Sequence, residues 1–165
     1  MGPIIANAIG YEFIDLDTEI EQRHSRTIVS LFNELGESGF RAIETSELSR
    51  VRQAERTVVS TGGGIVTVAD NRRILREAGF SVYLKLSPDA LAKRIGKSMG
   101  RPLLLGDDDR TLTDEALVLR IEQLISSRSE YYESADLVVD VESESVGEAV
   151  ETIVRSIRAS EKRSI

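Results

Sequence analysis

Short runs of β-branched and aromatic residues alternate along this chain with longer amphipathic stretches. This alternation limits the possible folds more than any other feature. The short runs cover residues 11–14, 58–60, 81–86 and 137–139, and the longer stretches include residues 2–9, 28–35, 38–54, 70–78, 113–133 and 146–159. Strands that alternate with helices pair in parallel, and the helices cover the sheet. We expect one α/β domain over residues 1–165, with ligands beyond the carboxyl ends of its strands.

Turn and capping residues divide the longer stretches. Gly10 is expected to end the first helix, and Thr27 to cap a helix that stops at Gly36. Thr18 and Glu21 have the spacing of a capping box. A hydroxyl residue, Thr113, is expected to start a helix that continues to about residue 133.

Composition excludes several classes of function. The 28 acidic and 21 basic residues give a net charge of −7, which argues against broad binding to nucleic acid or to an anionic membrane. There is no cysteine and only one histidine, so a disulfide, a thiolate metal site and a zinc enzyme are not expected. No apolar run approaches the roughly 20 residues of a membrane helix. We expect a cytoplasmic protein.

Two carboxylates, Asp15 and Asp17, follow the first strand. Side chains at i and i+2 of an extended segment point to the same side. This pattern suits one carboxylate near a magnesium ion and one bonded to a substrate hydroxyl. A solvated turn that caps the next helix is the alternative.

Three consecutive glycines, Gly62 to Gly64, follow the second strand. Such a run is costly in conformational entropy. It allows the backbone to approach a ligand closely, or it simply forms a sharp turn.

Three arginines are candidates for binding an anion. Arg41 and Glu44 are three residues apart on a predicted helix and can pair, either as a surface ion pair or as a guanidinium aimed at a substrate carboxylate. Arg101 lies in a polar segment that reads as a loop. Arg128 lies on the predicted helix after that loop. Each of these last two could equally be a solvated side chain.

The order of these motifs resembles shikimate kinase over nearly the whole chain. It runs Asp-x-Asp, then Gly-Glu-x-x-Phe-Arg-x-x-Glu, then Thr-Gly-Gly-Gly, then Arg-Pro-Leu, then Arg-x-x-Tyr-Tyr. No single motif is specific, but the set of five is. Gluconate kinases share the general layout without the pairing of Phe-Arg with the triple glycine.

The resemblance implies a three-layer P-loop kinase fold with a parallel sheet, and a lid at about residues 96–112. The implied activity is transfer of the ATP γ-phosphoryl group to the 3-hydroxyl of shikimate, in the pathway to aromatic amino acids. The partners would be shikimate and ATP with Mg²⁺, and the enzyme is expected to be a monomer that binds neither nucleic acid nor membrane.

The resemblance also implies roles for residues by position. Asp17 would orient or deprotonate the attacking hydroxyl, and Asp15 would hold magnesium through water. The substrate-binding set would be Asp17, Arg41, Gly63 and Arg128, with the two arginines on the shikimate carboxylate. Arg101 would neutralise charge on the moving phosphoryl group, and Arg94 would lie against the adenine.

One departure from the family is large. The sequence has no Gly-x-x-x-x-Gly-Lys-Ser/Thr motif, and the segment from Met1 resembles the helix that follows this P-loop in the family. The resemblance therefore predicts that the first, central strand and the P-loop are missing, and that the 165 residues are inactive as a kinase. Two explanations remain open: a truncated sequence, and a non-catalytic protein that binds shikimate. We favour truncation, because Arg101 and Asp15 would serve ATP and magnesium. A kinase of another small hydroxy-acid, such as gluconate, is a third reading.

Overall fold

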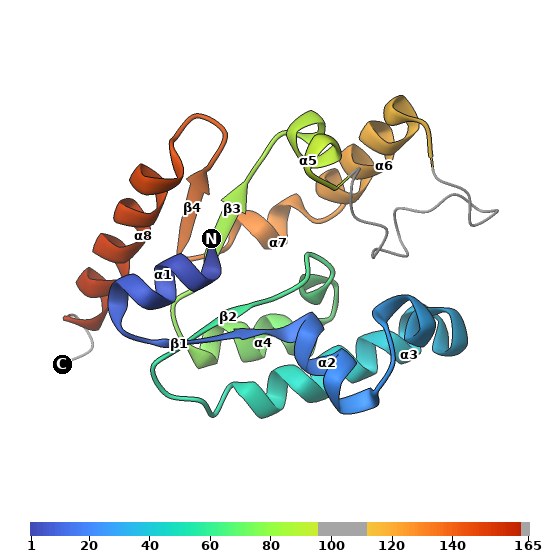
Figure 1. Cartoon of the computed structure of the whole chain (residues 1–165), viewed down its shortest axis with the longest axis horizontal. Helices are drawn as coiled ribbons and strands as arrows, with labels where there is room; N and C mark the ends of the chain where they lie inside the picture. The colour runs from blue at the N-terminus through green and yellow to red at the C-terminus, as the bar shows by residue number, and fades with distance from the viewer. Residues whose placement is uncertain (96–111, 163–165) are drawn as a thin grey trace.

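The structure is a computed structural model, and it describes residues 1–95 and 112–162. Helices and strands alternate along the chain, as Figure 1 shows. The predicted lid at residues 96–112 lies outside the described residues except for Leu112.

Four short strands form two separate parallel pairs. β1 (Glu12–Asp15) pairs with β2 (Thr57–Ser60), and β3 (Val82–Lys85) pairs with β4 (Leu137–Asp140). The α/β class with parallel strands is thereby confirmed. The strands do not form one continuous sheet, however, because no ladder joins β2 to β3 in the described part of the chain.

The helices surround these two pairs of strands (Figure 1). α1 contacts β1, β2 and α8, and α8 in turn contacts β4, so α1 bridges the two halves of the molecule. The helices are α1 (Gly2–Ile9), α2 (Leu16–His24), α3 (Ile28–Val51), α4 (Ala69–Ala78), α5 (Pro88–Ile95), α6 (Asp114–Ser126), α7 (Ser129–Glu133) and α8 (Val146–Glu161), with a 3-10 turn, η1 (Ile65–Thr67).

The predicted helix starts are mostly correct. Thr27 caps α3 by accepting a hydrogen bond from the Ser30 N–H, and Thr113 caps α6 in the same way. The prediction for Thr18 is wrong, because Asp15 caps α2 and accepts a hydrogen bond from the Thr18 N–H at 3.1 Å. The helix therefore begins at Leu16, one turn earlier than expected.

Two breaks shape the longer helical segments. Gly36 has φ 68° and ψ 178° inside α3, so it ends one helix and starts another, as the sequence predicted. The helix expected over residues 113–133 is instead two helices, α6 and α7. The break falls at Ser127 and Arg128, so Arg128 precedes the first residue of α7 and does not lie inside a helix.

Three apolar clusters fill the interior. The largest contains Leu16, Ile20, Leu48 and Ile65 and lies among α2, α3 and η1. A second packs α1 and α8 on β4, and a third joins α5 to α6. Within the described ranges, no helix combines the length and the apolar character needed to cross a membrane.

Candidate functional site

The carboxyl end of β1 carries two aspartates with different surroundings. Asp15 is the cap of α2, whereas Asp17 lies in the first turn of that helix and lines a large cavity. The prediction that both carboxylates extend from one side of an extended segment is therefore wrong, since the chain turns into a helix at Leu16. Asp17 alone reaches the cavity.

The triple glycine lies beside Asp17. A Cβ placed on Gly62 would lie 3.5 Å from Asp17 Oδ1 and 3.7 Å from Glu44 Oε1, which shows how near these carboxylates are to the turn. The turn is closed by two hydrogen bonds, from the Ile65 N–H to the Gly62 oxygen at 3.2 Å and from the Thr67 N–H to the Gly64 oxygen at 3.0 Å. The backbone of the triple glycine therefore lies close to Asp17, the carboxylate that is predicted to bind the substrate.

Arg41 is a buried arginine on α3, with 9% of its surface exposed. Its guanidinium is paired with Glu44, which is only 2% exposed, and donates to Glu37 Oε1 at 3.2 Å. This excludes the surface ion pair that the sequence left open. The Arg41 Nε donor is buried and has no partner among the described residues. An unpaired buried donor is costly.

The pKa of Glu44 is shifted in opposite directions by its surroundings. Burial raises the pKa of its carboxyl, because the charged form loses water, while the hydrogen bond and positive charge of Arg41 lower it. Asp17 raises the same pKa and Arg128 lowers it, by charge alone. Asp17, Arg41 and Arg128 therefore all lie near enough to Glu44 to influence its pKa.

Arg128 is at the start of α7 and lines the same cavity. Four residues later in the chain, the Tyr132 hydroxyl donates to the Gly63 oxygen at 2.6 Å, and the Tyr132 ring stacks on Tyr83 with centroids 4.9 Å apart. Arg128 and Gly63 are thus linked through Tyr132. The sequence motif Arg-x-x-Tyr-Tyr contains this tyrosine, but no part of the sequence signals its hydroxyl contact.

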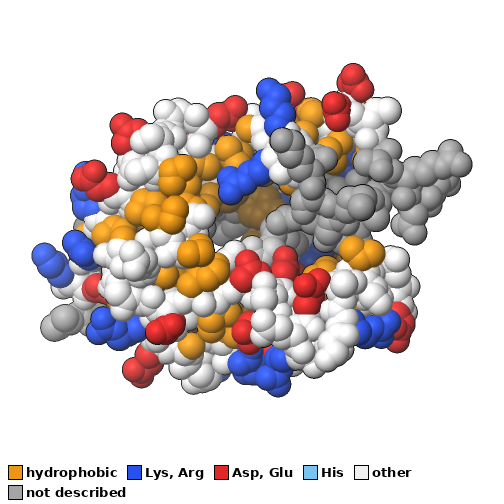
Figure 2. All heavy atoms as spheres, viewed as in Figure 1, with side chains coloured by type: hydrophobic (Ala, Val, Ile, Leu, Met, Phe, Trp, Pro, Cys, Tyr) orange, Lys and Arg blue, Asp and Glu red, His pale blue; other side chains and the backbone are white. Residues whose placement is uncertain are grey.

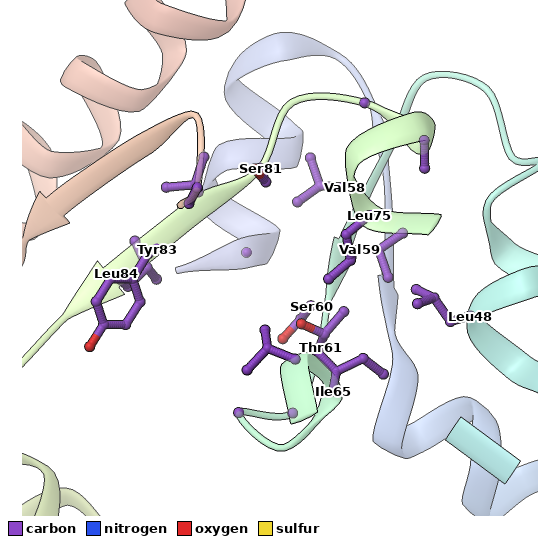
Figure 3. Close-up of a pocket in the computed structure, with 18 of the residues that line it drawn as sticks. Leu48, Val58, Val59, Ser60, Thr61, Ile65, Leu75, Ser81, Tyr83 and Leu84 are labelled. Carbon is purple, nitrogen blue, oxygen red and sulfur yellow. The ribbon is translucent and has the colours of Figure 1, made fainter. Parts of the chain in front are cut away.

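The cavity has a volume of about 1410 Å³ and separates β2 from β3. Figure 3 shows Val58, Val59 and Ser60 on one side of it, and Tyr83 and Leu84 on the other. Figure 2, which has the same view as Figure 1, shows a hollow near the centre of the molecule, with hydrophobic side chains at the hollow. The charged cluster and the triple glycine lie where these strands end, as expected for a parallel α/β fold.

The structure describes only one of the two predicted nucleotide contacts. Arg94 is exposed on α5 and is not among the residues that line the cavity, and Arg101 lies outside the described residues. The described residues contain no group of three or more carboxylates or histidines that could hold a metal ion.

The comparisons with known proteins agree on one family. The family described as shikimate kinase matches residues 1–158. A shikimate kinase of Chlorobaculum tepidum is 41% identical over 164 residues, which covers 99% of this chain and 86% of the relative. One of Chlorobium limicola is 40% identical over 166 residues, covering 98% of this chain and 83% of the relative.

Solved structures give the same result. A shikimate kinase from Acinetobacter baumannii in complex with shikimate superposes with a TM-score of 0.85 at 29% identity, covering 96% of this chain and 85% of that one. The enzyme from Bacteroides thetaiotaomicron superposes with a TM-score of 0.81 at 32% identity, covering 99% and 90%. The motif order, the fold and these matches together show that this chain belongs to the shikimate kinase family.

Proposed function

We propose that the activity of this kinase is ATP-dependent phosphorylation of the 3-hydroxyl of shikimate, which yields shikimate 3-phosphate. The observation that supports this most is the position of Arg41: a buried guanidinium that lines the same cavity as Arg128 and Asp17. Family membership adds shikimate as the expected acceptor.

Arg41 and Arg128 would bind the shikimate carboxylate. A guanidinium offers a planar fork that bonds both oxygens of a carboxylate. Glu44 holds Arg41 in place from the protein side. Main-chain groups of Gly63 would contact the ligand, since glycine leaves the backbone accessible.

Asp17 would act on the reacting hydroxyl. It lines the cavity and lies beside the triple-glycine turn, so a hydroxyl placed there is within reach of its carboxylate. A positioned carboxylate orients the attacking hydroxyl and accepts its proton. Asp17 would therefore supply the group that orients and deprotonates the attacking hydroxyl.

Asp15 is the residue proposed to hold Mg²⁺ through water. One carboxylate suits Mg²⁺, which keeps several waters and takes other ligands from phosphate oxygens. Bound there, the ion would neutralise phosphate charge. The Asp15 oxygen Oδ1 already accepts the Thr18 N–H, and this hydrogen bond fixes the carboxylate at the carboxyl end of β1.

The donor side is proposed on family resemblance alone. Arg101 would neutralise the transferring phosphoryl group and Arg94 would lie against adenine. The sequence contains no P-loop, whose N–H groups, lysine and hydroxyl cradle the phosphates. We therefore expect the 165 residues by themselves to bind shikimate without turning it over. We also propose a cytoplasmic monomer.

The test is a coupled ADP-release assay on two versions of the protein. One is the 165-residue chain, and the other carries about 20 added N-terminal residues with a strand and a P-loop. Shikimate-dependent ADP release by the extended version alone supports the proposal. Turnover by the short chain would contradict the predicted inactivity.

Two further measurements separate the alternatives. A preference for gluconate over shikimate in the extended version would assign another hydroxy-acid as acceptor. Tight shikimate binding without turnover in both versions would favour a non-catalytic binding protein.

A further inference from the structure

We propose that Tyr132 is a positioning residue, which fixes the triple-glycine turn in the geometry that binds shikimate. This inference rests on the proposed function, because it assigns the turn to the shikimate site. It adds a residue that acts on the site through Gly63.

The glycines of the turn contribute no side-chain packing. Gly62, Gly63 and Gly64 have no side chains to pack, and consecutive glycines lose more conformational freedom on folding than other residues. Gly63 is also exposed. Its carbonyl, however, accepts the Tyr132 hydroxyl at 2.6 Å, from a residue 69 positions later in the chain. This hydrogen bond therefore anchors the middle of the turn to a different part of the fold.

The Tyr132 ring is itself held. It stacks on Tyr83 of β3 with an interplanar angle of 15° and a centroid distance of 4.9 Å. Tyr83 is half-buried, and burial raises the pKa of its hydroxyl. An aromatic ring packed in this way has few orientations available, so its hydroxyl is directed at Gly63.

The neighbouring tyrosine holds the end of the same segment. Arg72 lies over the Tyr131 ring, with its guanidinium carbon 4.1 Å from the ring centroid. Arg72 Nη1 donates to the Val66 oxygen at 2.6 Å and to the Thr67 oxygen at 3.1 Å. The two tyrosines of α7 thus act on the two ends of the segment from Gly63 to Thr67.

α7 also fixes the turn relative to Arg128. The Tyr131 and Tyr132 N–H groups both donate to the Arg128 oxygen, at 3.0 and 3.1 Å. One turn of helix therefore links the proposed carboxylate ligand to the hydroxyl that holds Gly63. Preorganisation of this kind increases affinity, because less freedom is lost when the ligand binds.

The test compares Tyr132→Phe with the unaltered chain. Phenylalanine keeps the ring and its stacking on Tyr83, and removes only the hydroxyl. We expect shikimate affinity by calorimetry to fall about 3- to 10-fold, the effect of one hydrogen bond. Amide hydrogen exchange at Ile65 and Thr67, whose N–H groups close the turn, should become faster. Exchange should not change at Ala149 of α8, whose N–H donates to the Ser145 oxygen.

Tyr11→Phe is the matched control. It also removes one tyrosine hydroxyl, which donates to Glu161 away from the turn. This variant should bind shikimate like the unaltered chain and leave the Ile65 and Thr67 exchange rates unchanged. Urea unfolding of both variants shows whether the comparison is made between folded proteins.

The outcomes separate the two proposals. Unchanged affinity in Tyr132→Phe, or equal losses in both variants, would overturn the positioning role and leave the proposed function in place. No shikimate binding by the unaltered chain would overturn the proposed function. Weaker binding and faster exchange confined to Tyr132→Phe support the inference, because a general loss of stability would also change exchange at Ala149.

Discussion

The guanidinium of Arg41 occupies the space where Gly64 would carry a side chain. A Cβ built on Gly64 would overlap both terminal nitrogens of Arg41. Gly64 has φ −79° and ψ −16°, a conformation that any residue adopts. Glycine is therefore needed here for space, not for backbone freedom.

Gly64→Ala should weaken shikimate binding about 10-fold or more, because the added methyl group would displace Arg41 from its position beside Glu44. A displacement of about 1 Å can cost on the order of 100-fold in function. Calorimetry with shikimate measures the loss. Gly147→Ala is the control, because a Cβ there meets only Ser145 Oγ at 4.0 Å. The control should bind normally, and equal binding by both variants would contradict this role for Gly64.

Arg41→Ala should abolish or strongly weaken shikimate binding. Losing a charge-assisted bond to a partly desolvated carboxylate costs about 2–5 kcal/mol. The change also leaves Glu44 buried without its partner, so Arg41→Lys is needed as a second variant that keeps the charge and loses the fork. Arg73→Ala, an exposed arginine on α4, is the control. Unaltered affinity in both Arg41 variants would remove Arg41 from the site.

Gly36→Ala should destabilise the protein by about 1–3 kcal/mol. The glycine has φ 68° and ψ 178°, a region that residues with a Cβ avoid. Urea unfolding measures the change in the free energy of unfolding. Gly147→Ala, inside α8, should instead be neutral or stabilising. A neutral result at Gly36 would show that α3 can continue through the break.

Asp136→Asn should remove part of the acid sensitivity of the fold. Hydrogen bonds from the Ser81 hydroxyl and N–H, at 2.6 and 2.8 Å, lower the pKa of Asp136. A lowered pKa in the folded state adds stability above the unfolded pKa, and this stability is lost as pH falls through the folded pKa.

The variant should thus be less stable at pH 7, by about 0.5–1 kcal/mol given the exposure of Asp136, with the difference vanishing in strong acid. Urea unfolding at pH 7 and in acid below the folded pKa of Asp136 measures both values. A difference that stays constant with pH would contradict this role for the Asp136 charge.

The sequence predicted local features well where one residue type dominates. Gly36 was identified as a break because glycine alone tolerates its backbone angles. The cap of α2 was misassigned because Asp15 and Thr18 are both good capping residues three positions apart, and only the structure shows which one accepts the hydrogen bond. The break before α7 was missed because Ser127 and Arg128 are neither glycine nor proline.

Contacts between distant segments could not be predicted. The hydrogen bond from Tyr132 to Gly63 joins residues from two halves of the chain. The sequence also contains Gly-Lys-Ser at residues 96–98, but Leu91 stands where a P-loop needs its first glycine. That tripeptide is therefore not a P-loop, and the prediction that the P-loop is missing does not change.

Because the strands form two unjoined pairs, a ligand bound to both halves would stabilise the whole chain. Arg41 belongs to the half built on β1 and β2, whereas Arg128 follows α6 and leads into α7, which packs on β3 through Tyr132. A single carboxylate gripped by both arginines would be a cross-link between the halves. Shikimate would then tighten the whole molecule as it binds, and each increase in its concentration above the dissociation constant would add to the work needed to pull the halves apart.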